Sequence, residues 1–207
     1  MKLLYGTTNK AKIKSMKTYV SGLGVEILSL DDVNAPELDI EESGKSPLEN
    51  ATIKAMAYYN ALKMPVFSLD SGMYIDDLAN DDPRQPGVHV RRINGRRLND
   101  DELMEYYANM SVQLGGKMTA RYRNGICLVI NETSIHKHDG DDIATAKFII
   151  SPKPHATRNP GFPVDSLSIH IQSGQYYYDL NDAGNANKYY GIDDGFTAFF
   201  RRALNIQ

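Results

Sequence analysis

The first thirty residues alternate between a strand-like, a helix-like and a second strand-like pattern, and this order constrains the fold more than any other feature of the chain. Leu3-Leu4-Tyr5 is a short apolar run that predicts a buried strand. A helix is expected to follow, with Ile13, Met16 and Val20 on its buried side. Residues 25–30 predict the second strand. A strand, a helix and a strand in this order favour a right-handed crossover and a largely parallel sheet.

Helix-like and strand-like patterns continue through the rest of the chain. The chain has 207 residues, of which 42% are hydrophobic, so residues 1–207 are long and apolar enough for one sizeable α/β domain or for one domain with two lobes. Further strands are expected over 65–69, 73–78, 118–131, 143–151 and 166–171, and further helices over 46–62, 99–110 and 194–204. Residues 81–97 and 151–163 are predicted loops.

The overall charge and the single cysteine limit the setting in which the chain works. The net charge is −3 and the sequence pI about 5.9, which gives no overall attraction to nucleic acid or to an anionic membrane. No apolar run is long enough to span a membrane, and residues 1–5 lack a signal-peptide pattern. Cys127 cannot form an internal disulfide, so we expect a buried thiol in a reducing, cytoplasmic protein.

Three residues signal the start of the helix that is expected from residue 46. Ser46 suits the N-cap, Pro47 the first helical position, and Glu49 stands at the capping-box spacing from Ser46. Glu49 therefore has two interpretations, as a capping carboxylate or as a metal-binding carboxylate that faces a phosphate. Asn50 and Lys54 are four residues apart and share another side of the helix.

Two further segments carry polar side chains where open α/β sheets place their sites. Residues 6–9 join the first strand to its helix, and Lys12 follows in the first turn, so the loop and the lysine either bind an anion or form an ordinary connection. Asp70-Ser71-Gly72 is expected just after the strand over 65–69, either as a site at the carboxyl end of the strand or as a simple turn.

Two loops contain clusters of side chains that suggest other chemistry. The loop over 81–97 carries five arginines, which either meet phosphates or form a solvated basic surface. Residues 131–142 contain histidines and aspartates, but no zinc or EF-hand spacing, so loop composition explains them better than a metal site. Within this connection Asp139-Gly140 predicts a hairpin turn.

Four segments, in order, resemble motifs of the Ham1 family of inosine/xanthosine triphosphate pyrophosphatases. Residues 7–12 (T-T-N-K-A-K) resemble the family's T-G-N-x-x-K opening, and residues 49–55 (E-N-A-T-I-K-A) its E-N-A-x-x-K-A segment. Residues 69–73 (L-D-S-G-M) resemble D-D-S-G-L, and residues 86–92 (P-G-V-H-V-R-R) resemble P-G-x-x-S-A-R. Together these segments span most of the first hundred residues.

The second half of the chain departs from the family pattern. Leu69 replaces the first aspartate of the family's pair, residues 161–166 (G-F-P-V-D-S) stand for G-F-G-Y-D-P, and S-H-R has no clear counterpart. Because the later motifs help the family to recognise the base, the resemblance supports triphosphate chemistry better than inosine or xanthosine as the base.

The resemblance implies a fold and a reaction. The fold would be α/β, with an elongated, twisted mixed β-sheet, flanking helices and two lobes around a central cleft, in a homodimer. The reaction would be Mg²⁺-dependent hydrolysis of a nucleoside triphosphate between its α and β phosphates, with a non-standard purine such as ITP, dITP or XTP as the expected base.

The resemblance also assigns roles to residues. Lys12, Glu49 and Asp70 would be catalytic, with Glu49 as the metal ligand and Asp70 as a second ligand or as the base that orients water. Substrate binding would involve Thr7, Thr8, Asn9, Lys12, Lys54, Ser71 and Arg92 for the triphosphate, and Phe162 and Asp165 for the base.

Four other interpretations of the sequence are possible. Leu69 and the missing S-H-R favour a non-catalytic nucleotide-binding or interaction protein on the same fold, or a pyrophosphatase with altered base preference. A Maf-like pyrophosphatase shares the general architecture, but the segment over 49–55 argues against it. A nucleic-acid binder is disfavoured by the negative net charge.

Overall fold

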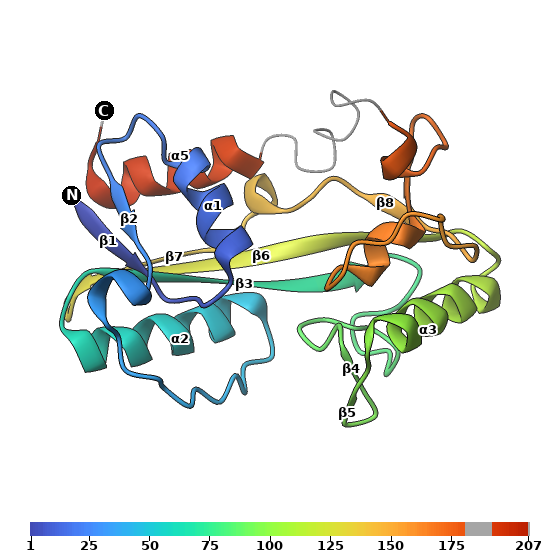
Figure 1. Ribbon diagram of the computed structural model, residues 1–207, viewed down its shortest axis with the longest axis horizontal. Helices are drawn as coiled ribbons and strands as arrows, with labels where there is room; N and C mark the ends of the chain where they lie inside the picture. The colour runs from blue at the N-terminus through green and yellow to red at the C-terminus, as the bar shows by residue number, and fades with distance from the viewer. Residues whose placement is uncertain (181–191, 207) are drawn as a thin grey trace. The chain divides into compact units, whose positions relative to one another are not determined.

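The computed structural model describes residues 1–180 and 192–206 of the chain. The fold is mixed α/β, with a mixed sheet and flanking helices, as predicted (Figure 1). The described residues divide into two compact units. The first contains residues 1–71, 123–144 and 192–206, and the second contains residues 72–122 and 145–180.

The first unit is built on the parallel arrangement that the N-terminal pattern predicts. Strand β1 (Lys2–Tyr5) pairs in parallel with β2 (Glu26–Leu28) on one side and with β3 (Val66–Ile75) on the other. Strand β6 (Met118–Asn131) pairs antiparallel with β7 (Ser134–His138). Three helices accompany these strands: α1 (Lys10–Tyr19), α2 (Pro47–Leu62) and α5 (Ile192–Leu204).

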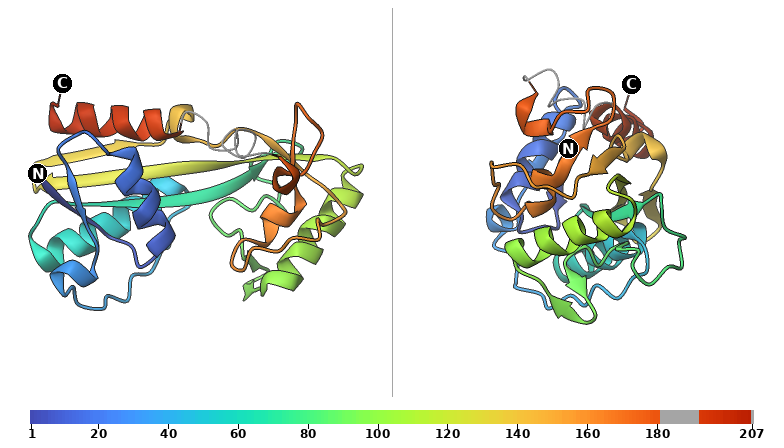
Figure 2. Two further views of the ribbon diagram at one scale, coloured as in Figure 1. Left: turned by 45° about the horizontal axis from the view of Figure 1, so that its top comes forward. Right: turned by 90° about the vertical axis from the view of Figure 1, so that its right-hand side faces the viewer.

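The side chains of the first unit separate into two apolar layers because alternate residues of a strand face opposite sides. In β1, for example, Leu3 and Tyr5 face one layer and Leu4 the other. The layer with α1 and α5 includes Leu3, Tyr5, Met16, Val20, Phe67, Leu69, Ile126, Leu128, Phe196 and Phe200. The layer with α2 includes Leu4, Ala51, Ala55, Tyr58, Tyr59, Val66, Cys127 and Val129. Figure 2 (left) likewise places α5 and α2 on opposite faces of the strands.

Two glycines allow α2 and the strands of this unit to approach closely. A Cβ atom on Gly125 of β6 would lie 2.3 Å from the backbone nitrogen of Leu48. A Cβ atom on Gly6, just after β1, would lie 2.5 Å from the hydroxyl oxygen of Ser68 and 2.7 Å from the ring of Tyr58. The start of α2, which carries the predicted site residues, therefore rests directly on strand backbone.

The second unit is antiparallel. Strand β6 pairs with β8 (Phe148–Ile150), which pairs with β9 (Ser168–His170), and a two-stranded ribbon is formed by β4 (Arg92–Ile93) and β5 (Arg96–Arg97). Helix α3 (Asp100–Gln113) has a complete capping box between Asn99 and Glu102. The core of this unit includes Met73, Ile75, Leu103, Tyr107, Met110, Met118, Phe148, Ile150, Val164 and Leu167.

Four predicted boundaries are wrong, for reasons that lie outside the local sequence. Strand β3 does not end before Asp70-Ser71-Gly72 but continues through it to Ile75. The β6–β7 hairpin turns between Asn131 and Ser134, not at Asp139-Gly140. The strand expected over 143–151 is formed only at 148–150, because 141–143 forms a short 3₁₀ helix. The strand expected over 166–171 is likewise shorter, at 168–170.

Cys127 is fully buried and unpaired, as predicted, and burial raises the pKa of its thiol. Within the part of the chain that the structure describes, no helix combines the length and the apolar character needed to cross a membrane.

Candidate active site

The centre of the candidate site is an ammonium group shared by two carboxylates. Nζ of Lys54, on α2, lies 3.1 Å from Oδ1 of Asp70 on β3 and 3.0 Å from Oε2 of Glu42. The side chains of Lys54 and Asp70 are only 15% and 14% exposed, whereas that of Glu42 is 44% exposed. A partly buried carboxylate of this kind needs a cation beside it, and Lys54 supplies that charge.

The second oxygen of Asp70 is held by an amide. Nδ2 of Asn50 donates to Oδ2 of Asp70 at 3.2 Å, and the backbone N–H of Gly44 donates to Oδ1 of Asn50 at 2.8 Å. Asn50 is 3% exposed, so bulk water does not compete for these two hydrogen bonds. Both oxygens of the Asp70 carboxylate are therefore oriented by side chains of one helix.

The start of α1 brings a second cation near this centre. The ammonium group of Lys12 lies within the electrostatic influence of Lys54, Asp70 and Glu42. Burial lowers the pKa of Lys12, and the charge of Lys54 lowers it further, while Asp70 and Glu42 act in the opposite direction. Lys54 and Asp70 are thus in direct contact in the first unit, and the charges of both act on the ammonium group of Lys12.

The loop before α1 is shaped by its own hydrogen bonds. Oδ1 of Asn9 caps the helix by accepting from the backbone N–H groups of Ala11 and Lys12, and Oγ1 of Thr7 accepts from the N–H of Asn9. These amides are therefore already bonded within the chain, which limits the anion-binding interpretation of the loop backbone. Thr8 is exposed.

Glu49 serves the helix start and still presents a carboxylate oxygen to its surroundings. Ser46 caps α2 by accepting from the N–H of Glu49, and Oε2 of Glu49 accepts from the N–H of Lys45 at 2.7 Å. The residue is exposed, and among the described residues its Oε1 atom has no hydrogen-bond partner. Ser46 is therefore confirmed as the N-cap, but the Glu49 side chain bonds to the N–H of Lys45 and not to that of Ser46, so the predicted capping box is not completed. One oxygen of Glu49 is left available for a ligand.

The residues beside Asp70 explain why β3 continues through this point. Oγ of Ser71 donates to Oδ1 of Asn124 at 2.6 Å, and Nδ2 of Asn124 donates to the carbonyl oxygen of Ile143 at 2.6 Å. Ser71 is thereby tied into the unit's hydrogen bonding. Leu69 packs in the apolar layer with α1 and α5, on the other face of the strand from Asp70.

The other predicted substrate residues, Arg92, Phe162 and Asp165, belong to the second unit. Arg92 is exposed on β4, whereas its neighbour Arg91 is held by Asp100 at 2.7 Å and donates to the carbonyl oxygen of Gly161 at 2.8 Å. Asp100 also accepts from the N–H of Gly161 at 2.7 Å. The bond from Gly161 and the bond from Arg91 both lower the pKa of Asp100.

The anchored Gly161 segment presents a free aromatic face. Phe162 follows Gly161 and is 48% exposed, although it is a large apolar side chain. Asp165 is partly buried. Arg91 therefore ties the loop over 81–97 to the Gly161 segment, whereas Arg92, the arginine chosen from the sequence, is exposed beside it.

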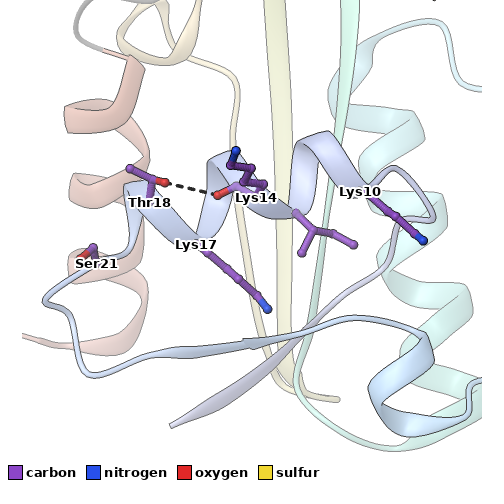
Figure 3. Close-up of a pocket in the computed structure, with 6 residues that line it drawn as sticks. Lys10, Lys14, Lys17, Thr18 and Ser21 are labelled. Carbon is purple, nitrogen blue, oxygen red and sulfur yellow. Dashed lines mark hydrogen bonds between the residues drawn. The ribbon is translucent and has the colours of Figure 1, made fainter.

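A hollow of about 520 Å³ on the outer side of α1 does not coincide with this site. It is lined by Lys10, Ile13, Lys14, Lys17, Thr18 and Ser21. Figure 3 shows Lys10 and Lys17 extending from the same side of the helix, with the hydrogen bond from Thr18 to the carbonyl oxygen of Lys14. No predicted site residue lines this hollow, so we attribute it to the solvated lysine face of α1.

Sequence reasoning missed Glu42, Gly44 and Asn50. Glu42 and Gly44 lie in an irregular acidic segment without periodic signal. Asn50 does carry a signal, because it is polar yet stands beside the apolar face of α2, within the E-N-A segment. In residues 1–180 and 192–206 no group of three or more histidine, cysteine, aspartate and glutamate side chains is arranged to hold a metal ion by itself.

The fold and the site together define an α/β protein with a charged site on β3, just past the carboxyl end of its parallel neighbour β1. Such strand ends are where open α/β sheets bind ligands. The Ham1 family model matches residues 3–147, and the chain belongs to this family. A dITP/XTP pyrophosphatase of Halalkalibacterium halodurans is 31% identical over 160 residues, which are 77% of this chain and 78% of that protein.

Other similarities agree with this assignment. A dITP/XTP pyrophosphatase of Aquifex aeolicus is 38% identical over 92 residues, and the alignment spans only 44% of this chain and 42% of that relative. A HAM1 protein from Coxiella burnetii has the same fold, with a TM-score of 0.76 and 20% identity over 98% of this chain and 99% of that chain.

Proposed function

We propose that the protein is a nucleoside triphosphate pyrophosphatase. It hydrolyses a nucleoside triphosphate to the monophosphate and pyrophosphate, and its preferred base is a non-standard purine, as in ITP, dITP or XTP. The two relatives described above are dITP/XTP pyrophosphatases, and this similarity supports the reaction class. In the reaction, a water oxygen forms a new P–O bond, the α–β phosphoanhydride bond breaks, and a proton of the water passes to a base.

The observation that carries the proposal is the partly buried Lys54–Asp70 pair with the charge of Lys12 close to it. Phosphoryl transfer depends more on positioning and charge stabilisation than on covalent help from the protein. Lys12 and Lys54 would neutralise phosphate oxygens. Asp70 would either accept the proton of the attacking water or share in binding a metal.

The carboxylates of the site fit a magnesium ion. Mg²⁺ prefers oxygen ligands and usually binds through one or two carboxylates together with phosphate oxygens and water. Glu49 offers an unbonded oxygen, and Asp70 is the second candidate ligand. A bound Mg²⁺ would neutralise negative charge on the triphosphate, which lowers the cost of breaking the phosphoanhydride bond.

The remaining assignments are proposals of the same kind. Thr7, Thr8, Asn9, Ser71 and Arg92 would bind the triphosphate, and Phe162 and Asp165 the base. The missing S-H-R segment supports an altered base preference. We also propose a cytoplasmic homodimer that does not bind nucleic acid, in keeping with the net charge of −3.

The proposal is tested with purified protein and a panel of nucleoside triphosphates that includes ITP, dITP, XTP and the standard nucleotides. Pyrophosphate and inorganic phosphate are measured separately, with Mg²⁺ present or chelated. We expect Mg²⁺-dependent pyrophosphate and an equal amount of monophosphate. Nucleotide binding without product would instead favour a non-catalytic nucleotide-binding protein.

The metal-ligand assignment of Glu49 is tested by Glu49→Gln. We expect turnover to be lost with the fold intact, because the amide can still accept a hydrogen bond from Lys45 but carries no charge for the metal. Glu41→Gln is the matched control, since Glu41 is an exposed carboxylate of the acidic segment that precedes α2. Unchanged turnover of the Glu49→Gln protein would remove Glu49 from the metal site.

A further inference from the structure

Asn50 links three parts of the first unit through one buried side chain. Its Oδ1 atom accepts from the N–H of Gly44 at 2.8 Å, and its Nδ2 atom donates to Oδ2 of Asp70 at 3.2 Å. A backbone N–H can only donate, so it requires the amide oxygen of Asn50 to face Gly44. The NH₂ group must then face Asp70, and the orientation of the side chain is determined from both ends.

The contact with Gly44 is close enough to exclude any other residue there. A Cβ atom at position 44 would lie 2.6 Å from Oδ1 of Asn50 and 2.7 Å from Cβ of Glu49. The backbone of the acidic segment is therefore held against the first turns of α2 at this point.

These contacts close a ring of interactions around the carboxylate. Asp70 binds Lys54 through Oδ1 and Asn50 through Oδ2. Lys54 binds Glu42, and Asn50 binds Gly44, two residues further along the same segment. The two groups that bind Asp70 are thus each held by a second bond, Lys54 by Glu42 and Asn50 by Gly44. The Asp70 carboxylate is therefore held in one rotational orientation.

We propose that Asn50 is a positioning residue that holds the Asp70 carboxylate in its productive orientation. This role rests on the proposed function, because it matters for turnover only if Asp70 acts on the attacking water or on the metal. A carboxylate that can rotate would place its oxygen off the reacting geometry, and such misplacement costs turnover more than binding. The simpler alternative is that Asn50 only anchors the segment around Gly44.

Two substitutions separate these roles. Asn50→Asp keeps an oxygen that accepts from Gly44 but loses the NH₂ donor to Asp70. Asn50→Leu has a similar size, carries no charge, and loses both contacts. The two variants share only the loss of the donor to Asp70. Asn60→Asp and Asn60→Leu, at an exposed asparagine of the same helix, are the matched controls.

For both Asn50 variants we expect kcat to fall by about 100-fold while KM changes by less than about threefold. The Asn60 variants should match the wild type. Wild-type kcat in the Asn50→Asp protein would overturn the proposal, because a residue that only anchors the segment still keeps its contact with Gly44 in this variant. A rise in KM with an unchanged kcat would overturn it as well.

A readout without turnover separates failure of this inference from failure of the proposed function. A crystal structure of the Asn50→Leu protein should show the Asp70 carboxylate rotated from its wild-type orientation, and an unchanged carboxylate would overturn the proposal. A wild-type protein that releases no pyrophosphate from any nucleotide would refute the proposed function, whatever the crystal structure shows.

Discussion

Lys54 is balanced by two carboxylates of unequal exposure, and this inequality has consequences for binding. Asp70 is mostly buried, so moving Lys54 away from it would leave a poorly solvated negative charge. Such an unpaired buried charge is unfavourable in free energy. Glu42 is 44% exposed, and an ion pair with such a group contributes little. An incoming phosphate would therefore displace Glu42 from Lys54 more readily than Asp70.

We predict that Glu42→Gln lowers KM for the triphosphate by up to about fivefold, because the variant lacks a carboxylate that competes with phosphate for Lys54. About 1 kcal/mol, the upper end for an exposed ion pair, corresponds to that change. KM measured at saturating Mg²⁺ is the readout, with Glu41→Gln as control. A raised KM would mean that Glu42 helps to bind the substrate or its metal.

The lowered pKa of Lys12 predicts a pH effect on activity. A lysine with a lowered pKa loses its positive charge at a lower pH than an exposed lysine. If Lys12 binds phosphate, kcat/KM should decline as the pH rises through this lowered pKa. The arginine side chain of the Lys12→Arg protein stays positively charged at every pH where Lys12 loses its charge. The decline in kcat/KM should therefore begin at a higher pH in this variant than in the wild type.

The measurement is kcat/KM between about pH 7 and about pH 10, which reports groups of the free enzyme. Lys10→Arg is the control, because Lys10 is an exposed lysine of the same helical turn. Equal profiles for the wild type and Lys12→Arg would show that Lys12 does not control substrate binding.

At the scale of elements, α2 determines the geometry of the site. Its N-terminal turns carry Glu49, Asn50 and Lys54, and its buried residues pack on β1, β3 and β6. The helix start lies against the backbone of β6 at Gly125. A change in this single packing contact should therefore reach the catalytic residues.

We predict that Gly125→Ala destabilises the protein by about 1–3 kcal/mol, the usual cost of an extra group in a well-packed region. The new methyl group would collide with the backbone of Leu48, which cannot rotate away. Because Glu49 and Asn50 follow immediately, kcat should fall as well. Urea unfolding and kcat test this.

Glu132→Ala, in the exposed β6–β7 turn, is the control for Gly125→Ala and should change the free energy of unfolding by less than about 0.5 kcal/mol. Wild-type stability and kcat in the Gly125→Ala protein would contradict the close packing of α2 on β6.

At the scale of the whole molecule, the two compact units are not separable by a single cut. The first unit comprises three described segments of the chain and the second comprises two. Strands β3 and β6 each contribute residues to both units. We therefore propose that residues 1–207 form one folding domain.

We predict a single unfolding transition for this domain, since both units depend on the same two strands. Calorimetry should give a van't Hoff enthalpy equal to the calorimetric enthalpy. Two resolved transitions would contradict the proposal and would mean that the units fold separately.

The local sequence determined those helices and strands whose capping residues, turn residues and apolar periodicity all lie within a short stretch of the chain. Helix α2 begins at Pro47 and ends at Leu62 as predicted, because a capping serine, an N1 proline and a periodic apolar face all agree. The N-terminal strand, helix and strand form the parallel pairing that their order predicts. Glu49, Lys54 and Asp70 could be chosen because each lies in a matched motif.

Only the tertiary structure decided how these residues are connected. Strand β3 continues through Asp70-Ser71-Gly72 because Ser71 bonds to Asn124 and Gly72 lies against the backbone of Gly87, and neither partner is near in sequence. The ring around Asp70 likewise joins an irregular segment to a helix and a strand. Hydrogen bonds between distant residues leave no periodic pattern in a sequence, so these contacts could be found only in the folded chain.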